Sequence, residues 1–320
     1  MSSKPSVLVL GATGFVGKNL LPRLSKLTPD ITAVYRSVRA RDAAASVVQS
    51  PGIKWVNAGD GIAGAVARAA ASGPIDVVIQ LAGRINGTAA ELKQGNFGIT
   101  RGLLQALDAA GSRPRVVYLS SVSAINRLGE YGNQKRLAEE AIAAWTSNYV
   151  CLRSSLVYGP FDTNNVAKLV GAVRRWPVIP VPGGRAVALQ PLYIDDLCDA
   201  ICSAAFNADV NGALVVAGPR QEKLWDMLRV IQHALSRNQL LVPVSLGLLQ
   251  SISSILIRVA PWLPLPMQQI NTLHDHPPWS SEQARDALGF SPRVFADGIA
   301  HYLKAAQVDG SRNPSEKTDG

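Results

Sequence analysis

Tyr131 and Lys135 are the two residues whose types and spacing most directly suggest proton-transfer chemistry. They stand four residues apart in the string YGNQK, so on a helix they share one face. An ammonium group beside a phenol favours the phenolate and lowers the tyrosine pKa from about 10 toward the working pH. We therefore expect Tyr131 to act as a general acid and base on a substrate hydroxyl or carbonyl.

A second chemical signal is a group of glycines that directly follows an apolar run, in VLVLGATGFVG at 7–17. Glycines at this spacing permit a tight turn, a close approach of the backbone to a pyrophosphate, and close packing of helix on strand. The N-terminus of the following helix offers free N–H groups and a positive dipole to phosphates. The string predicts a nicotinamide-dinucleotide site, with cofactor contacts from Gly11, Thr13, Gly14, Phe15, Val16 and Gly17.

The end of the second predicted strand distinguishes NAD from NADP. Enzymes that use NAD usually present an acid to the ribose 2′-hydroxyl there, and enzymes that use NADP present a cation to the 2′-phosphate. The string AVYRSVRAR has no acid before Asp42 and places Arg36 at the discriminating position, with Arg39 close by. We expect NADP(H) rather than NAD(H).

Short apolar runs alternate with helical patterns through the first half of the chain. Strands that are apolar throughout and alternate with helices are typical of a parallel sheet covered on both faces. The expected fold class is α/β, a Rossmann-type doubly wound parallel sheet. The predicted strands are 7–10, 31–35, 54–56, 77–81, 116–119 and 149–153, and the predicted helices are 17–26, 61–71 and 100–110.

The pattern becomes irregular after the sixth predicted strand. Gly159 and Pro160 interrupt the chain, PVIPVPGG at 177–184 predicts a loop, and 190–193 predicts a strand that returns to the sheet. We expect a Rossmann dinucleotide-binding domain of residues 1–157, completed by 186–217. Residues 158–185 and 218–307 would form a smaller, mainly helical substrate-binding lobe, and the polar residues 308–320 a disordered tail.

Residues 240–257 form a run of 18 residues without a charge, which is long enough for a transmembrane helix. Against a membrane span, Pro243 interrupts the run and several serines and a glutamine follow. The apolar residues at 248–259 recur at helical spacing, which indicates an amphipathic helix packed in a core. The other interpretation of this run is a flap that covers a hydrophobic or lipid-linked substrate. Membrane association is not expected.

Composition argues against several other classes of protein. The net charge of +9 comes from scattered Lys and Arg without a nucleic-acid-binding motif, so no nucleic-acid partner is expected. Cys151, Cys198 and Cys202 fit no disulfide framework and indicate a reducing compartment. No secretory pattern precedes the first strand, so a cytoplasmic protein is expected. His274 and His276 lack further ligands nearby, so no metal is expected.

Several motifs, in the same order along the chain, resemble those of the extended short-chain dehydrogenase/reductase family. This family includes NAD-dependent nucleotide-sugar epimerases and dehydratases, and the resemblance spans residues 6–305. The motifs are GATGFVG at 11–17, Asp60 in NAGDGI, LAG at 81–83, Asn96 in GNFGIT, YLSS at 118–121 before YGNQK at 131–135, LRSSLVYGP at 152–160, QPLYIDDLCDAI at 190–201 and WSSEQARDALGFSPR at 279–293.

The resemblance implies roles for individual residues. Asp60 would contact the adenine ring, and Lys135 would hydrogen-bond the nicotinamide ribose. A serine after the fifth strand would polarise the substrate oxygen, and Ser121 holds the family position, with Ser123 as the alternative. Residues that would line the cofactor are Leu81, Ala82, Gly83, Asn96 and, at the nicotinamide end, Tyr131 and Lys135.

Three functions are compatible with these motifs. The first is an NAD(P)-dependent epimerase or other oxidoreductase that acts on a nucleotide sugar by hydride transfer. Dehydration is disfavoured, because Val122 and Ser123 stand where the family's dehydratases carry an acidic pair. The second is a reductase of a hydrophobic, steroid- or flavonoid-like ketone, which the uncharged run favours.

The third function is a non-catalytic NADPH-holding scaffold or assembly subunit. It is favoured because Ser121 and Tyr131 are ten residues apart, closer than in most members of the family. Members of the family often pair through a four-helix interface, so a homodimer is possible by analogy.

Overall fold

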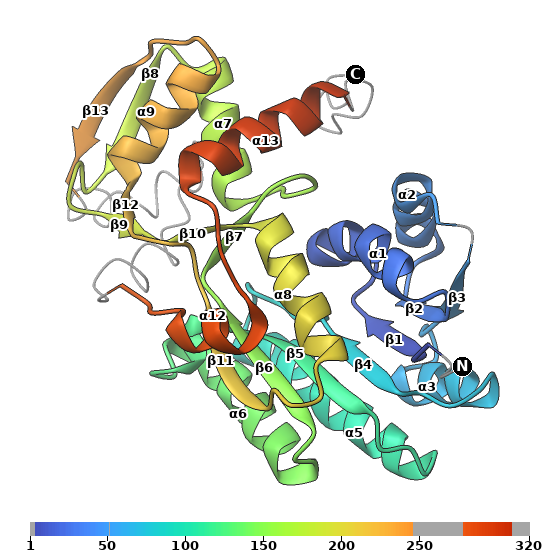
Figure 1. Cartoon of the computed structure of the whole chain (residues 1–320). Helices are drawn as coiled ribbons and strands as arrows, with labels where there is room; N and C mark the ends of the chain where they lie inside the picture. Colours follow the sequence, from blue (N-terminus) through green and yellow to red (C-terminus); the bar gives the residue numbers. More distant parts are fainter. Residues whose placement is uncertain (1–3, 51, 246–277, 309–320) are drawn as a thin grey trace. The chain divides into compact units, whose positions relative to one another are not determined.

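The computed structural model describes residues 4–50, 52–245 and 278–308, which are coloured in Figure 1. The amphipathic helix predicted at 248–259, His274 and His276, and the predicted tail beyond residue 308 lie outside the described residues. The chain divides into two compact units. The first comprises Met1–Ser155, Ile194–Ala217 and Asp275–Pro292, and the second Leu156–Tyr193, Gly218–His274 and Arg293–Gly320.

A seven-stranded parallel sheet organises the first unit. Its strand order is β11-β6-β5-β4-β1-β2-β3, and helices cover both faces (Figure 1). The predicted Rossmann-type fold class is therefore confirmed. The strands are β1 (Val7–Leu10), β2 (Ile31–Tyr35), β3 (Ile53–Asn57), β4 (Val77–Gln80), β5 (Arg115–Ser121), β6 (Tyr149–Ser154) and β11 (Gly212–Val216).

The order of the strands reverses between β1 and β4. The residues of β1 pair in parallel register with those of β2 on one side and β4 on the other, so Leu10 faces both Val34 and Gln80. Open parallel sheets bind ligands outside the carboxyl ends of the strands at such a reversal. The sheet topology therefore places the ligand site after Leu10 and Gln80.

Helices from both halves of the chain enclose the sheet. One face carries α1, α2 and α8, and the other carries α3, α5 and α6 (Figure 1). Their bounds are α1 (Phe15–Leu27), α2 (Val38–Val48), α3 (Ile62–Ala71), α5 (Ile99–Ala109), α6 (Gly129–Trp145) and α8 (Ile194–Phe206), with the shorter α4 (Ala89–Lys93), α12 (Glu282–Leu288), a π-helix over Gln94–Gly98 and a 3₁₀ turn over Val122–Ala124.

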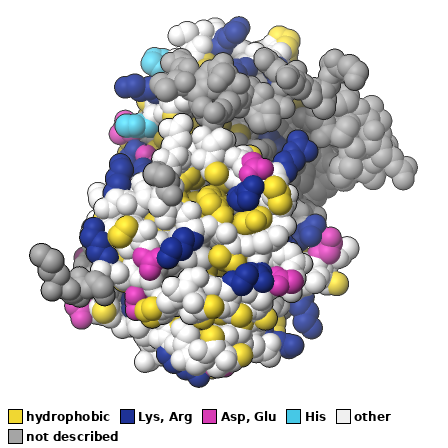
Figure 2. Space-filling model, turned by 90° about the vertical axis from the view of Figure 1, so that its right-hand side faces the viewer, with side chains coloured by type: hydrophobic (Ala, Val, Ile, Leu, Met, Phe, Trp, Pro, Cys, Tyr) yellow, Lys and Arg dark blue, Asp and Glu magenta, His cyan; other side chains and the backbone are white. Residues whose placement is uncertain are grey.

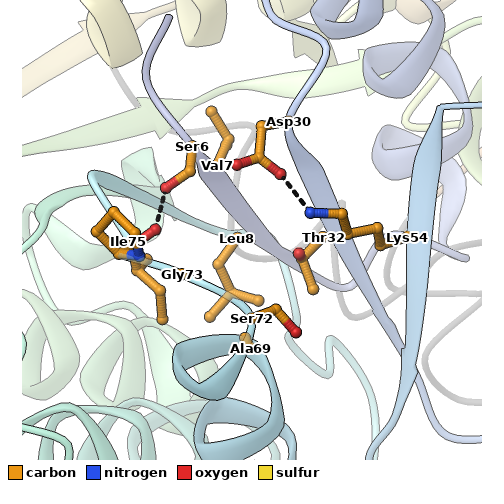
Figure 3. Close-up of a pocket in the computed structure, with 11 residues that line it drawn as sticks. Ser6, Val7, Leu8, Asp30, Thr32, Lys54, Ala69, Ser72, Gly73 and Ile75 are labelled. Atoms are coloured by element: carbon orange, nitrogen blue, oxygen red, sulfur yellow. Dashed lines mark hydrogen bonds and ion pairs between the residues drawn. The ribbon is translucent and has the colours of Figure 1, made fainter. Parts of the chain in front are cut away.

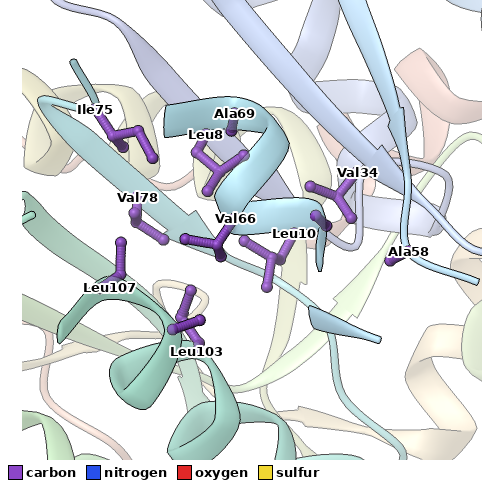
Figure 4. Packing of buried hydrophobic residues seen from close by; sticks show 12 residues of the cluster. Leu8, Leu10, Val34, Ala58, Val66, Ala69, Ile75, Val78, Leu103 and Leu107 are labelled. Atoms are coloured by element: carbon purple, nitrogen blue, oxygen red, sulfur yellow. The ribbon is translucent and has the colours of Figure 1, made fainter. Parts of the chain in front are cut away.

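A continuous apolar layer fixes β1 and β4 against the helices. Leu8 and Val78 pack against Val66 of α3 and against Leu103 and Leu107 of α5, and none of the five is more than 1% exposed (Figure 4). Burial of each large aliphatic side chain contributes about 1.5–3 kcal/mol. The two strands that border the site are therefore held by the strongest packing available to them.

Polar contacts tie together the opposite edge of the sheet, at the amino ends of the strands. Lys54 lies 2.9 Å from Asp30, and the Ser6 hydroxyl donates to the Pro74 carbonyl (Figure 3). The hollow between these residues holds little more than one water molecule. This hollow is therefore too small for a dinucleotide.

The described residues of the second unit form three two-stranded sheets besides the helices. β7 (Leu156–Tyr158) pairs in parallel with β10 (Pro191–Tyr193), so the prediction that 190–193 returns to the main sheet is wrong. The first five residues of the uncharged run form strand β13. The other elements are β8 (Val178–Pro182) paired with β13 (Leu240–Val244), β9 (Ala188–Leu189) paired with β12 (Glu222–Lys223), and the helices α7 (Asn165–Arg175), α9 (Leu224–Ala234) and α13 (Phe295–Val308).

An aromatic cluster forms the core of this unit. Tyr158 is fully buried, with its ring centroid 5.2 Å from that of Phe295 and 5.5 Å from that of Tyr193. Its hydroxyl donates to the Phe295 carbonyl at 3.3 Å. The tyrosine of the VYGP string therefore packs α13 against the β7–β10 pair.

Four findings concern the described residues alone. No helix within them has the length and hydropathy needed to cross a membrane, and they contain no cluster of three metal-ligating side chains. The three cysteines are free and buried. On the face drawn in Figure 2, Lys and Arg side chains are scattered among Asp and Glu rather than gathered in one patch.

Arg115 is a buried cation at the start of β5, with 5% of its surface exposed. Its guanidinium donates to the carbonyls of Ala204 and Val210 and to the side-chain oxygens of Asn148 and Asn211. It thereby joins β5 to the end of α8 and to the turn before β11. Burial lowers its pKa from the ordinary value.

We predict that Arg115→Met lowers the free energy of unfolding by about 2–4 kcal/mol, because several buried acceptors lose their donors. Urea denaturation measures the loss. Arg101→Met, an exposed position on α5, is the control and should change stability little. An equal loss of stability in both variants would contradict the stabilising role of the Arg115 hydrogen bonds.

Candidate active site

The glycine loop lies against the segment that follows β4. Gly11 has a φ of +82°, and a Cβ placed there would lie 2.6 Å from the Ala82 nitrogen and 2.9 Å from the Leu81 carbonyl carbon. A Cβ on Gly17, in the first turn of α1, would overlap the Ala12 carbonyl. Both positions therefore require glycine, and the loop runs directly alongside residues 81–82.

The N-terminus of α1 is open to an anion. Gly14 is its N-cap and its N–H donates to the Gly11 carbonyl at 3.0 Å. No side chain caps this end, and the first turn carries no acid. The loop residues Thr13, Phe15 and Val16 are partly exposed around it. A glycine cradle at an uncapped helix N-terminus fits the pyrophosphate of a dinucleotide.

Gly83, Asn96 and Lys135 meet beyond the end of β4. A Cβ on Gly83 would lie 3.0 Å from Asn96 Oδ1 and 3.2 Å from Lys135 Nζ. Asn96 sits in the π-helix, and its amide donates to the carbonyls of Arg84 and Leu92 at 2.8 and 2.9 Å. Its oxygen accepts from the Arg84 N–H at 3.2 Å. Asn96 thus fixes the backbone that follows the 81–83 segment.

The predicted catalytic residues lie together at the end of β5. Ser121 is the last residue of that strand, and its side chain lies near enough to Tyr131 of α6 to lower the pKa of the phenol. The Lys135 ammonium donates to the Leu119 carbonyl at 2.9 Å and lies 5.9 Å from the centroid of the Tyr131 ring. Strand β5 and helix α6 therefore bring Ser121, Tyr131 and Lys135 into one site.

Ser123, the alternative serine, lies in the 3₁₀ turn and is buried. Its N–H donates to Ser121 Oγ at 3.2 Å, and its carbonyl accepts from the Leu128 N–H at 2.9 Å. Gly132 packs on that carbonyl, where a Cβ would overlap it. The backbone of Ser123 therefore supports Ser121, and Ser121 is the serine whose side chain acts on the pKa of Tyr131.

Burial dominates the electrostatics of the pair. It raises the pKa of Tyr131 to about 12, and the hydrogen bond with Ser121 acts in the opposite direction. It lowers the pKa of Lys135 from 10.5 to about 8, against the opposing charge of Glu139. The expectation that Lys135 lowers the Tyr131 pKa toward neutrality is therefore wrong in this structure, because desolvation outweighs the ammonium at this distance.

The residues expected at the adenosine end lie on the neighbouring strands. Arg36 and Arg39, just beyond β2, are exposed and form no ion pair with any described residue. Asp60, after β3, is engaged by Arg68, whose two terminal nitrogens lie 2.7 Å from its two carboxylate oxygens. This bonding lowers the Asp60 pKa. The adenine contact expected of Asp60 stays a prediction.

Sequence reasoning missed two side chains near the site, Arg68 and Glu139. Nothing in the spacing of Asp60 and Arg68 signals their contact. Glu139 stands four residues after Lys135, the spacing at which helical side chains become neighbours. That signal could have identified Glu139.

Comparison with known proteins identifies the family to which the chain belongs. The model of the NAD dependent epimerase/dehydratase family matches residues 7–218. A comparison with curated protein sequences found no match.

Solved structures of similar fold include a UDP-N-acetylglucosamine 4-epimerase from Methanobrevibacter ruminantium in complex with UDP-N-acetylmuramic acid. It is 17% identical with a TM-score of 0.75, over 96% of this chain and 99% of that one. A UDP-glucuronic acid 4-epimerase from Bacillus cereus, in complex with UDP-glucuronic acid and NAD, is 17% identical with a TM-score of 0.73, over 95% and 99%. MoeE5, in complex with UDP-glucose and NAD, is 20% identical with a TM-score of 0.73, over 96% and 100%.

At these identities the solved structures establish the fold, and the family match establishes the lineage. That match covers the whole glycine loop, the 81–83 segment and the Ser121, Tyr131 and Lys135 positions. The chain belongs to the NAD dependent epimerase/dehydratase family and is an enzyme of the extended short-chain dehydrogenase/reductase type.

Proposed function

We propose that the enzyme epimerises or oxidises and reduces a nucleotide sugar, with Tyr131 as general acid and base. The observation that carries this proposal is the grouping of three side chains at the carboxyl end of β5: Ser121 ends the strand, and the ammonium of the buried Lys135 lies 5.9 Å from the centroid of the Tyr131 ring. A tyrosine in this setting can exchange a proton with a sugar hydroxyl. The second unit would hold the sugar nucleotide.

The chain's own residues would bind the dinucleotide at two places. The glycine loop and the N-terminus of α1 would hold the pyrophosphate, and Gly83, Asn96 and Lys135 would line the nicotinamide ribose. When bound, the nicotinamide supplies the hydride acceptor and donor at the sugar carbon. Gly83 is essential to this arrangement, because a side chain there would occupy the space beside Lys135 Nζ.

Proton exchange falls to Tyr131 and Ser121. Tyr131 would accept the proton of the sugar hydroxyl as its carbon is oxidised and return a proton as the carbonyl is reduced. Ser121 would donate a hydrogen bond to the same substrate oxygen. Because the pKa of Tyr131 is about 12, its resting form is the phenol, so the charge of Lys135 is needed when the phenolate forms.

The family and the ligands of similar structures support a nucleotide-sugar substrate. The three neighbours carry UDP-sugars, and two of them carry NAD. None of these findings supports a preference for NADP. Our proposal of NADP(H) rests on Arg36 and Arg39, whose exposed and unpaired charges suit a 2′-phosphate.

The described residues favour this function over a scaffold. The connection between Ser121 and Tyr131 is short, yet the Ser121 side chain still lies near enough to Tyr131 to lower its pKa. The apolar segment that favours a hydrophobic ketone lies mostly outside the described residues. The nucleotide-sugar proposal therefore has the more direct structural support.

We predict that Tyr131→Phe lowers kcat about 100-fold or more, because the proton donor and acceptor is lost. The assay follows interconversion of UDP-glucose, UDP-N-acetylglucosamine and UDP-glucuronic acid with their 4-epimers. Cofactor binding, measured by fluorescence, should persist. Tyr149→Phe, at the amino end of β6, is the matched control. Absence of turnover of every nucleotide sugar by the wild type would refute the proposed function.

The two serines give a second, directional test of the site. Ser121→Ala should lower kcat by more than Ser123→Ala does, because Ser121 is the serine whose side chain lowers the pKa of Tyr131. The reverse order would assign the catalytic role to Ser123. Both are small changes, and thermal denaturation checks that the folded state is retained.

We predict that Arg36→Ala weakens NADP(H) binding about tenfold and leaves NAD(H) binding nearly unchanged, because a charge-assisted contact to the 2′-phosphate is lost. Isothermal titration with both cofactors measures the ratio. Wild-type protein that binds NAD(H) more tightly than NADP(H) would overturn the cofactor proposal without affecting the catalytic one.

Lys135 carries its charge at a cost in stability. Its folded pKa of about 8 lies below the ordinary value of 10.5, so the unfolded chain binds more protons between these pH values. By linkage, the penalty is fully present below pH 8 and disappears as the pH rises to 10.5. A buried charge at a functional site is a common source of such a penalty.

We predict that Lys135→Met raises the free energy of unfolding at pH 7 by about 1–3 kcal/mol while it abolishes turnover. The substitution also removes the hydrogen bond to the Leu119 carbonyl. The gain in the free energy of unfolding is therefore smaller than the pKa shift of Lys135 alone would give. Urea unfolding at pH 7 and pH 10 measures the difference, which should shrink at the higher pH. A less stable variant at pH 7 would show that burial of the ammonium is not costly.

A further inference from the structure

Glu139 is a buried acid that the proposed mechanism does not use. It lies on α6, one turn after Lys135, and 5% of its surface is exposed. Its Oε1 accepts from the Ser120 hydroxyl at 2.5 Å. Arg153 contributes Nε, 3.0 Å from Oε1, and Nη2, 2.7 Å from Oε2.

The partners of Glu139 lie side by side in the sheet. Ser120 of β5 and Arg153 of β6 are register partners, and Ser154 Oγ donates to the Ser120 carbonyl at 3.2 Å. One carboxylate from α6 therefore joins the ends of two strands. Ser120 immediately precedes Ser121, so this contact lies directly beside the serine whose side chain lowers the pKa of Tyr131.

The same carboxylate acts on the charge of Lys135. The groups facing Lys135 are Tyr131 and Glu139 on its own helix, the Tyr118 ring and Leu119 carbonyl of β5, Cys151 of β6, and the Asn96 amide of the π-helix. Burial lowers the Lys135 pKa, and Glu139 is the largest opposing influence. Arg153, whose pKa is raised by its bond to Glu139, supplies the countercharge.

We propose that Glu139 is a positioning residue for the reaction, which keeps the ammonium charge on Lys135 and holds the end of β5 in place under Ser121. Its significance for catalysis rests on the proposed function of Lys135, whereas its effect on the charge of Lys135 does not. An ordinary structural ion pair would contribute to folding alone, and buried pairs of that kind are often replaceable without loss of stability.

The decisive measurement is the titration of Lys135 in the cofactor-free protein. Glu139→Gln keeps the shape and an acceptor for Ser120 but removes the charge. We expect NMR of ¹³C-labelled lysine, with Lys135 assigned through Lys135→Met, to show its pKa lowered from about 8 by about one unit. An unchanged Lys135 pKa in folded Glu139→Gln protein would overturn the proposal.

Glu140→Gln is the matched control, because Glu140 is the next residue of α6 and carries the same charge. It is exposed and pairs with Arg127 and Arg136 at 2.7 and 2.9 Å. We expect no change in the Lys135 pKa. An equal shift in both variants would show a general charge effect of the helix and would also overturn the proposal.

Glu139→Asp keeps the test usable should Glu139→Gln fail to fold. The charge is retained but withdrawn by one methylene, so the Lys135 pKa should fall by less than in the glutamine variant and kcat should fall through the weakened hold on Ser120. No fall in either quantity would contradict the positioning role.

Turnover separates the inference from the proposed function. In Glu139→Gln the alkaline limb of the kcat profile should move to lower pH by the same amount as the Lys135 pKa, with KM for the nucleotide sugar little changed. A shifted Lys135 pKa without a shifted limb would refute the use of that charge in catalysis. Wild-type protein without turnover would refute the proposed function, while the titration would still test Glu139.

Discussion

The close approach of Gly11 to the backbone of residues 81–82 is the contact on which the site depends. It exists because β1 and β4 are neighbours in register, and because Gly11 alone can turn the chain at a φ of +82° without a side chain between the two segments. The segment fixed in this way leads to Gly83, which meets Asn96 and Lys135. This backbone contact therefore links the glycine loop at 11–17 to the segment that meets Lys135 of α6.

Burial then works against the chemistry that this geometry permits. Taking a phenol and an ammonium out of water favours the neutral form of each, which is why the pKa of Tyr131 rises and that of Lys135 falls. A site that needs the lysine charged must supply an opposing charge nearby. Glu139, one helical turn after Lys135, is the largest influence that opposes the fall of its pKa, and Arg153 pairs with the Glu139 carboxylate.

The sequence predicted the main sheet well because its strands are buried on both faces and therefore read as continuous apolar runs, such as 77–80. It did not predict β8 and β13, since Pro180 and Pro243 lie within paired strands of a small sheet and read as breaks. Spacing placed Tyr131 and Lys135 on one helix face, but spacing carries no information about desolvation, so the direction of the Tyr131 pKa was wrong. The engagement of Asp60 by Arg68 is a tertiary contact without a local pattern.

The short connection between Ser121 and Tyr131 has a physical explanation that leaves the catalytic geometry intact. Strand β5 passes directly into the 3₁₀ turn, where Ser121 accepts the Ser123 N–H, and Gly132 lets α6 begin against the Ser123 carbonyl. A longer loop would add surface around the substrate but is not needed to bring Tyr131 to Ser121. The compressed connection therefore leaves fewer residues between Ser121 and Tyr131 that could contact a substrate.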